Sequence, residues 1–337
     1  MAERESDVSW SQTHLTRRLG IKLPIVQAPM AGGWTPPRLV ATVSEAGGLG
    51  SLAGAMLGPD ALRDQIRQIR SLTGQPFAVN LFAPLPEPSE VGLPDWAALH
   101  GVPAPTPTAR TFGFADQLSV VSDERVPVLS FTFGVPSTAG FTGFVIGTAT
   151  TVGEAVALAA AGVDAVVAQG YEAGGHRGTF QAPLNADELA ASLIGTMSLV
   201  PQMVDAVSIP VIASGGIMDG RGIAAARALG AQGVQLGTAF LATDEAGIDP
   251  GFRQALGEPT SVTAVLTGRP ARAVRSAEVR RLEASGIRPP DYPLPRLFLT
   301  EPPRLAGQGA PMARAIPAAQ LVELLERETM AAFEGMN

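Results

Sequence analysis

The chain has 337 residues, a formal net charge of -7 and no Cys. The missing Cys excludes thiolate catalysis, cysteine-bound zinc and iron–sulfur clusters, and the acidic balance argues against a nucleic-acid or anionic-membrane partner. No apolar run is long enough to span a membrane and the polar first residues lack the core of a signal peptide, so we expect a cytoplasmic protein.

Short apolar runs alternate with amphipathic stretches along most of the chain. The runs expected to form strands are Leu23–Ala28, Gly48–Leu52, Phe77–Leu81, Val126–Phe131, Gly143–Gly147, Val163–Ala168, Ile209–Ala213 and Gly233–Leu236. The stretches expected to form helices are Pro36–Ala46, Asp60–Ser71, Val152–Ala161, Leu184–Val207, Gly220–Leu229 and Pro317–Phe333. Strands that are apolar on both faces are typical of a parallel sheet covered by helices. Eight of them within about 220 residues predict an α/β fold of the (β/α)8 TIM-barrel type rather than a doubly wound sheet.

Three segments depart from this alternation and divide the chain. Seven prolines between Pro84 and Pro107 predict an irregular excursion over residues 84–120. The crossover across residues 134–143 is too short for a full helix. From Pro250 to Pro311 the alternation stops. We therefore expect a barrel in residues 1–245, a small second domain or lid in 246–311, and a C-terminal helix in 312–337 that packs back on the barrel.

The loop after the sixth expected strand carries the first candidate site. It reads QGYEAGGHRG over residues 169–178 and includes Gln169, Gly174, Gly175 and His176. Glycine allows close approach of the backbone to a ligand, and an imidazole can exchange protons near neutral pH. The active site of a TIM barrel lies at the carboxyl ends of its strands, where this loop begins. His176 is therefore the candidate catalytic residue.

The seventh and eighth expected strands end in glycine turns that predict a phosphate site. One turn contains Ser214, Gly215 and Gly216, and the other is the run from Gln235 through Leu236 and Gly237 to Thr238. Barrels commonly bind phosphate in these two loops, where free backbone N–H groups face the anion.

Other catalytic motifs are missing from the sequence. It contains no Walker loop, HExxH or GxSxG motif, and no metal-ligand spacing of Asp, Glu and His, so no metal is expected. Lys22 is the only lysine and precedes the first strand, which argues against a Schiff-base aldolase.

A set of short strings, in order along the chain, resembles the nitronate monooxygenases, formerly called 2-nitropropane dioxygenases. The strings are IVQAPMA (25–31), GGLG (47–50), FAVN (77–80), SFTFG (130–134), EAGGHRG (172–178), ASGG (213–216), QLGT (235–238) and GRPAR (268–272). QGYEAGGHRG together with GRPAR is similar to the class I branch of the family.

The resemblance implies non-covalent FMN and an oxidation of alkyl nitronates, and of nitroalkanes, by molecular oxygen to a carbonyl compound and nitrite. Ala28, Met30, Asn80, Gln169 and Gly174 would contact the ring and ribityl parts of FMN, with Gly175 on the same loop. Ser214, Gly215, Gly216, Gln235, Leu236, Gly237 and Thr238 would surround its phosphate. His176 would act as a base or hold the nitronate, and the protein would be a monomer or homodimer.

The sequence also departs from the class I pattern on the substrate side. The region after the third strand contains no Tyr; the chain has only Tyr171 and Tyr292. The alternatives therefore stay open: an NAD(P)H-dependent flavin reductase of quinones or enoyl thioesters, a divergent flavin oxygenase of a biosynthetic pathway, a barrel isomerase that binds a phosphorylated substrate, and a non-catalytic binding protein.

Overall fold

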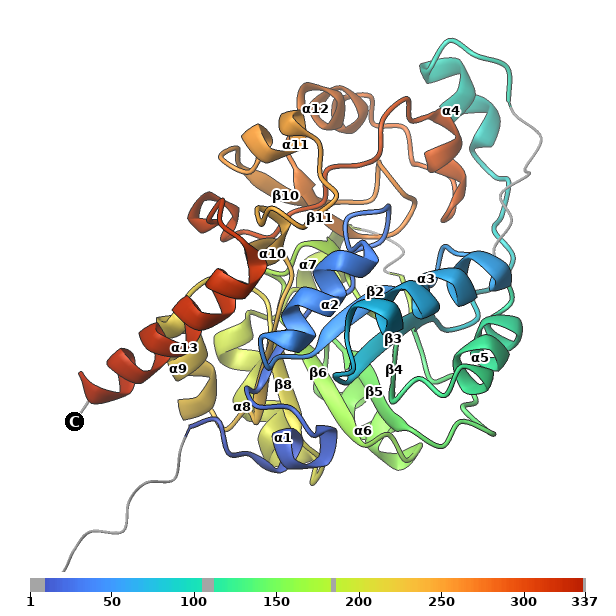
Figure 1. Ribbon diagram of the computed structural model, residues 1–337. Helices are drawn as coiled ribbons and strands as arrows, with labels where there is room; N and C mark the ends of the chain where they lie inside the picture. The colour runs from blue at the N-terminus through green and yellow to red at the C-terminus, as the bar shows by residue number, and fades with distance from the viewer. Residues whose placement is uncertain (1–9, 105–111, 183–185, 336–337) are drawn as a thin grey trace, which may run out of the picture.

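The computed structural model describes residues 10–104, 112–182 and 186–335, and its centre is a closed parallel barrel (Figure 1). The sheet order is β1-β9-β8-β6-β5-β4-β3-β2. The strands are β1 (Ile25–Gln27), β2 (Gly50–Ala53), β3 (Phe77–Phe82), β4 (Val128–Thr132), β5 (Phe144–Ala149), β6 (Ala165–Gln169), β8 (Val211–Ser214) and β9 (Gly233–Leu236). A parallel bridge between Val26 and Leu49 joins the two ends of the sheet. The predicted (β/α)8 barrel and its eight strands are confirmed.

Helices cover the outside of the barrel because the strands are apolar on both faces. They are α1 (His14–Leu19), α2 (Pro37–Glu45), α3 (Pro59–Leu72), α5 (Phe114–Asp123), α6 (Val152–Ala160), α7 (Ala186–Ser192), α8 (Thr196–Ala206), α9 (Gly220–Ala228), α10 (Thr238–Leu241) and α13 (Ala318–Glu334). The C-terminal helix α13 contacts α9 and α2. Leu321, Val322 and Leu325 of α13 are buried in the main core, so this helix closes the side of the barrel seen at the left of Figure 1.

The single helix predicted over Leu184–Val207 is wrong, because α7 and α8 are separated by residues 193–195. One backbone donor and one side-chain donor of the loop after β6 use carbonyls at this break. The N–H of Tyr171 donates to Ile194 O at 2.9 Å, and the guanidinium of Arg177 donates to Ser192 O at 3.2 Å. Helical periodicity of the side chains does not report such backbone contacts, which is why the break was not predicted.

The excursion at residues 84–120 is less irregular than its prolines predicted. A short helix, α4 (Leu93–Leu99), buries Trp96, and α5 begins at Phe114. Pro94 lies in the first turn of α4, where its missing N–H costs no hydrogen bond. Residues 105–111 lie outside the described residues. The segment at 134–143 has no helix, in agreement with the short crossover that the sequence predicted.

Residues 246–311 lie over the carboxyl ends of the barrel strands, at the top of Figure 1. Their elements are α11 (Pro250–Ala255), β10 (Thr260–Thr263), β11 (Ala271–Val274), α12 (Ala277–Ala284) and the 3-10 helices η1 (Leu294–Phe298) and η2 (Ala310–Met312). A second sheet has the order β10-β11-β7, in which β7 (Gly175–His176) comes from the loop after β6. The candidate catalytic loop therefore pairs as a short strand with this segment.

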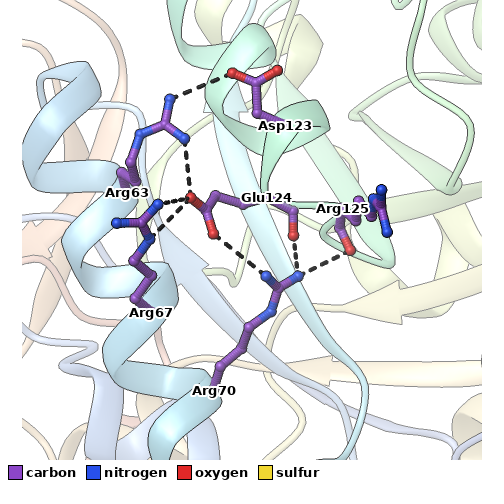
Figure 2. Close-up of polar contacts among 6 residues, drawn as sticks. All are labelled: Arg63, Arg67, Arg70, Asp123, Glu124 and Arg125. Atoms are coloured by element: carbon purple, nitrogen blue, oxygen red, sulfur yellow. Dashed lines mark hydrogen bonds and ion pairs between the residues drawn. The ribbon is translucent and has the colours of Figure 1, made fainter.

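A buried carboxylate joins α3 to the end of α5 (Figure 2). Glu124 is 9% exposed, and its carboxylate contacts Arg63 at 3.0 Å, Arg67 at 2.9 Å and Arg70 at 3.4 Å. Burial alone raises the pKa of Glu124, but the ion pairs with Arg67 and Arg63 outweigh it and leave that pKa below its usual range. The three arginines follow one another at helical spacing on α3, so the carboxylate of Glu124, with Asp123 beside Arg63, reduces the repulsion among their charges.

We expect Glu124→Gln to lower the free energy of unfolding at neutral pH by about 1–3 kcal/mol, because Arg67 and Arg70 lose their charged partner and Arg63 keeps only Asp123. Since the folded-state pKa of Glu124 is lowered, its stabilisation is present above the unfolded pKa and is lost as the pH falls through the folded pKa. Urea unfolding of both proteins at pH 7 and at acidic pH measures this difference. The same substitution at Glu323, which is exposed on α13, is the control. Equal losses at both pH values would contradict the ion-pair explanation.

Candidate active site

One cavity at the carboxyl ends of the barrel strands holds every residue that the sequence predicted for the site. Its empty space, including the open mouth, is about 1460 Å³. The predicted residues in its lining are Ala28, Met30, Asn80, Gln169, Gly174, Gly175, His176, Ser214, Gly215, Gly216, Gln235, Leu236, Gly237 and Thr238. They come from five different strand ends of the barrel, and the segment at residues 246–311 adds further lining residues.

The loop that carries His176 is fixed by contacts on both sides. His176 pairs with Ala271 of β11, and the N–H of Arg177 donates to Pro270 O at 2.8 Å. A Cβ on Gly174 would lie 2.4 Å from the backbone N of Gly307, so only glycine fits where the loop meets this segment. The backbone positions the imidazole before any ligand binds.

Gln169 holds the same loop from the barrel side. Its Nε2 donates to His176 O at 3.0 Å, and its Oε1 accepts the N–H of Gly178 at 2.8 Å. Both amide atoms of this cavity-lining side chain are therefore engaged in shaping the loop. The neighbouring Asn80 donates its Nδ2 to Ser130 Oγ at 3.0 Å, which leaves its Oδ1 as an acceptor at the cavity wall.

Hydrogen bonding determines which nitrogen of His176 carries the proton. Nε2 lies 3.0 Å from Thr267 Oγ1, and the same hydroxyl donates to Arg269 O at 3.1 Å. A carbonyl oxygen only accepts, so the single hydroxyl proton of Thr267 is used there and its oxygen accepts from His176. The neutral ring is therefore protonated at Nε2. Its Nδ1 carries the lone pair and has no hydrogen-bond partner among the described residues.

The surroundings of His176 keep its imidazole neutral. Desolvation lowers its pKa most, and the positive charges of Arg269 and Arg296 lower it further, to about 3. Aromatic rings supply the apolar surroundings: those of Phe133 and Tyr292 meet the imidazole edge to face, with centroids 5.8 Å and 5.4 Å away. Both arginines instead favour a negative charge beside the ring.

Two glycine turns, which the sequence predicted as an anion-binding cradle, line another part of the same cavity. Gly215 and Gly216 have φ of 117° and 71°, which L residues rarely adopt. The amides of Gly215, Gly216 and Gly237 have no acceptor within the part of the chain that the structure describes, so they are available to a ligand. Thr238 Oγ1 accepts the N–H of Gly307 at 2.9 Å and ties the cradle to the segment above it.

Comparison with known proteins identifies the family. The nitronate monooxygenase family model matches residues 12–301. A probable nitronate monooxygenase from Staphylococcus saprophyticus is 44% identical over 301 residues, which are 84% of each chain. The chain belongs to the nitronate monooxygenase family. The resemblance that the ordered strings indicated is thus confirmed, and the protein is an oxidoreductase of that family.

Solved structures agree with this assignment and add a second relative. A nitroalkane oxidase from Streptomyces ansochromogenes matches with a TM-score of 0.85 and 42% identity, over 96% of this chain and 99% of that chain. FabK from Thermotoga maritima matches with a TM-score of 0.74 and 30% identity, over 96% of this chain and 98% of that chain. No helix among the described residues is long and apolar enough to cross a membrane.

Sequence reasoning missed the residues that this nitronate monooxygenase family member places around His176 from distant segments. Thr267, Tyr292 and Arg296 all lie in the segment after residue 246, and Thr267 is 91 residues from its partner His176. The region after β3 contains no Tyr. Tyr292, from the segment after residue 246, instead places its ring 5.4 Å from that of His176. The GRPAR string, next to Thr267, was a signal in the sequence that pointed toward this segment.

Proposed function

We propose that the protein binds FMN non-covalently and oxidises alkyl nitronates with molecular oxygen. Two nitronates react with one O2: one oxygen atom joins the carbon that carried nitrogen in each, both C–N bonds break, and the products are two carbonyl compounds and two nitrite ions. The observation that carries this proposal is a neutral imidazole with a free lone pair beside two arginines. This arrangement suits an anionic substrate or one that becomes anionic when it loses a proton.

The lining residues fit FMN. The free amides of Gly215, Gly216 and Gly237 suit a phosphate, since such amides bind an anion without a cationic side chain. Glu172 packs beside Gly216 of this cradle. Its carboxylate accepts the N–H and the hydroxyl of Thr196 at 3.0 Å and 2.9 Å, and these bonds hold it in place. Asn80 and Ser130 offer amide and hydroxyl groups to the polar edge of a flavin ring. Bound flavin would supply the transfer of electrons from the substrate to oxygen.

The protein's own residues bind and orient the substrate. Nδ1 of His176 is the free acceptor, because Nε2 is already engaged with Thr267. It accepts a hydrogen bond from the ligand, or a proton from the carbon next to a nitro group when the nitronate that forms beside it offsets the lowering of the imidazole pKa. Arg296 lines the cavity and makes no ion pair with a carboxylate of the described chain, so its charge stays available to nitronate oxygens. Phe133 and Tyr292 exclude water from the ring. We further propose that residues 246–311 act as a small second domain that covers the cavity.

Anaerobic mixing of the purified holoprotein with an alkyl nitronate, without nicotinamide, tests the proposed function. We expect the absorbance of oxidised flavin to fall, and oxygen to restore it with release of nitrite. Heat-denatured protein should release FMN rather than FAD. A spectrum that changes only with NADH or NADPH would favour the flavin-reductase alternative. Colourless protein that takes up no flavin would contradict both readings.

A further inference from the structure

A second cavity adjoins the candidate active site and is not used by the mechanism above. Its empty space, including its opening, is about 1350 Å³. It lies between the segment after β3, the start of α5 and the helix η1. Ala55, Met56, Phe82 and Arg296 line both cavities, so the two spaces share one wall.

The wall of this second cavity is mainly apolar. Its apolar residues outside the shared wall are Ala83, Pro84, Leu85, Pro86, Pro88, Phe112, Phe114, Pro293 and Leu297. Of the polar side chains, Gln117 is already used, because its Nε2 donates to the carbonyls of Gly54, Ala55 and Leu57. Glu87 is exposed. A ligand there finds hydrophobic surface and few hydrogen-bonding groups.

Two residues connect this second cavity directly to the imidazole. Phe82 and Tyr292 line it, and their ring centroids lie 6.4 Å and 5.4 Å from that of His176. Arg296 stands at the shared wall, where its NH1 lies 3.0 Å from Met56 Sδ. Arg296 also hydrogen-bonds the side chain of Tyr292. Neither the thioether, a weak acceptor on a flexible side chain, nor the phenol carries a negative charge, so an anionic partner replaces them.

We propose that this second cavity binds the alkyl tail of the substrate, so that the protein acts on nitronates of long unbranched chains rather than on the shortest ones. The inference rests on the proposed function. The nitronate group lies by His176 with its charge near Arg296, and the tail passes Phe82 and Tyr292 into the apolar space. A short substrate leaves the second cavity to water. A long alkyl chain removes both its own apolar surface and the apolar wall of the cavity from water, which strengthens binding.

The first test compares nitronates of nitroethane, nitrobutane and nitrooctane as substrates of the holoprotein. We expect kcat/KM to rise about fourfold per methylene that enters the second cavity, which is the fold-change for taking one CH2 out of water. The rise ends when the chain fills the cavity. Equal kcat/KM along the series, with nitrite still formed, would overturn the tail site and leave the proposed function standing.

The second test measures binding without turnover. A carboxylate has two oxygens that share one negative charge, as a nitronate has, so butyrate and octanoate serve as unreactive probes in calorimetry of the holoprotein. We expect octanoate to bind at least tenfold more tightly. Leu297→Glu should remove that preference because it places a charge in the apolar wall, and Leu85→Trp should remove it by filling the space. Leu297 is 37% exposed, so its replacement spares the core.

Leu72→Glu is the matched control, because Leu72 is 54% exposed at the end of α3 and lines neither cavity. It should keep the preference for octanoate. Loss of the preference for octanoate in Leu72→Glu, or its survival in both Leu297→Glu and Leu85→Trp, would show that the alkyl chain of the ligand binds elsewhere. Either result would overturn the proposal. A preference that depends on Leu297 in a protein that oxidises no nitronate would support the tail site and contradict the proposed function instead.

Discussion

Replacing His176 with Asn is expected to lower kcat/KM for a neutral nitroalkane by about 10²- to 10⁴-fold, the usual contribution of a positioned general base. An Asn amide still donates a hydrogen bond to Thr267, but it has no nitrogen lone pair to replace Nδ1. The loss should be smaller for the corresponding nitronate, which has already given up its proton. Parallel assays of nitrite formation from both substrates measure the two effects.

Flavin content separates this effect from damage to the site. His176 binds through its backbone to β11 and Gln169, so the Asn variant should keep the loop and retain its FMN. His14→Asn makes the same replacement at an exposed helix residue and should leave both rates unchanged. An unaltered nitroalkane rate in His176→Asn would remove His176 from the mechanism.

The pH dependence follows from the same surroundings. With a pKa of about 3, His176 stays neutral between pH 5 and pH 8, so its own ionisation should not appear in the rate profile over that range. Between pH 6.5 and about pH 3, His176 binds a proton in the unfolded chain but not in the folded protein. Its contribution to the free energy of unfolding therefore falls as the pH falls through this range. A rate with nitronate that drops near pH 6.5 in the wild type, but not in His176→Asn, would contradict the neutral imidazole.

The barrel was predictable because each part of the prediction depends on local sequence. Apolar runs such as residues 165–168 indicate strands buried on both faces, and glycine turns follow the strands that became β8 and β9. In a barrel, strand ends meet at one rim whatever the intervening sequence, so residues as far apart as Asn80 and Gly237 come to line one cavity. The general geometry of a barrel, rather than the sequence between the strands, therefore predicted which distant residues lie close together.

No such rule applies to the segment at residues 246–311. Thr267 and Tyr292 contact His176 because an antiparallel sheet forms between β11 and the short β7, and a two-residue strand has no recognisable pattern in the sequence. The break between α7 and α8 has the same origin, since the donors that use it belong to the loop of His176. The errors of prediction therefore concentrate where this loop meets the rest of the chain.

The second large effect is expected for Gly237→Asp, which should leave a folded protein that purifies with little or no FMN. Gly237 lies in the second of the two turns that form the anion-binding cradle and lines the cavity, and its amide has no acceptor among the described residues. A Cβ there would lie 3.4 Å from Ala28 Cβ and 3.8 Å from Met30 Sδ, which are ordinary contacts, and φ of -102° suits an L residue. The carboxylate, rather than a steric clash, therefore opposes the phosphate.

Two controls identify the charge as the cause. Gly237→Ala adds the same Cβ without the carboxylate and should bind FMN far more tightly than Gly237→Asp in a fluorescence titration of the apoprotein. Gly74→Asp makes the charged substitution at an exposed glycine with no atom within 4 Å of its Cβ, and it should bind FMN as the wild type does. Added salt should partly restore binding to Gly237→Asp, because screening weakens like-charge repulsion. Normal flavin content in Gly237→Asp would place the phosphate elsewhere in the cavity.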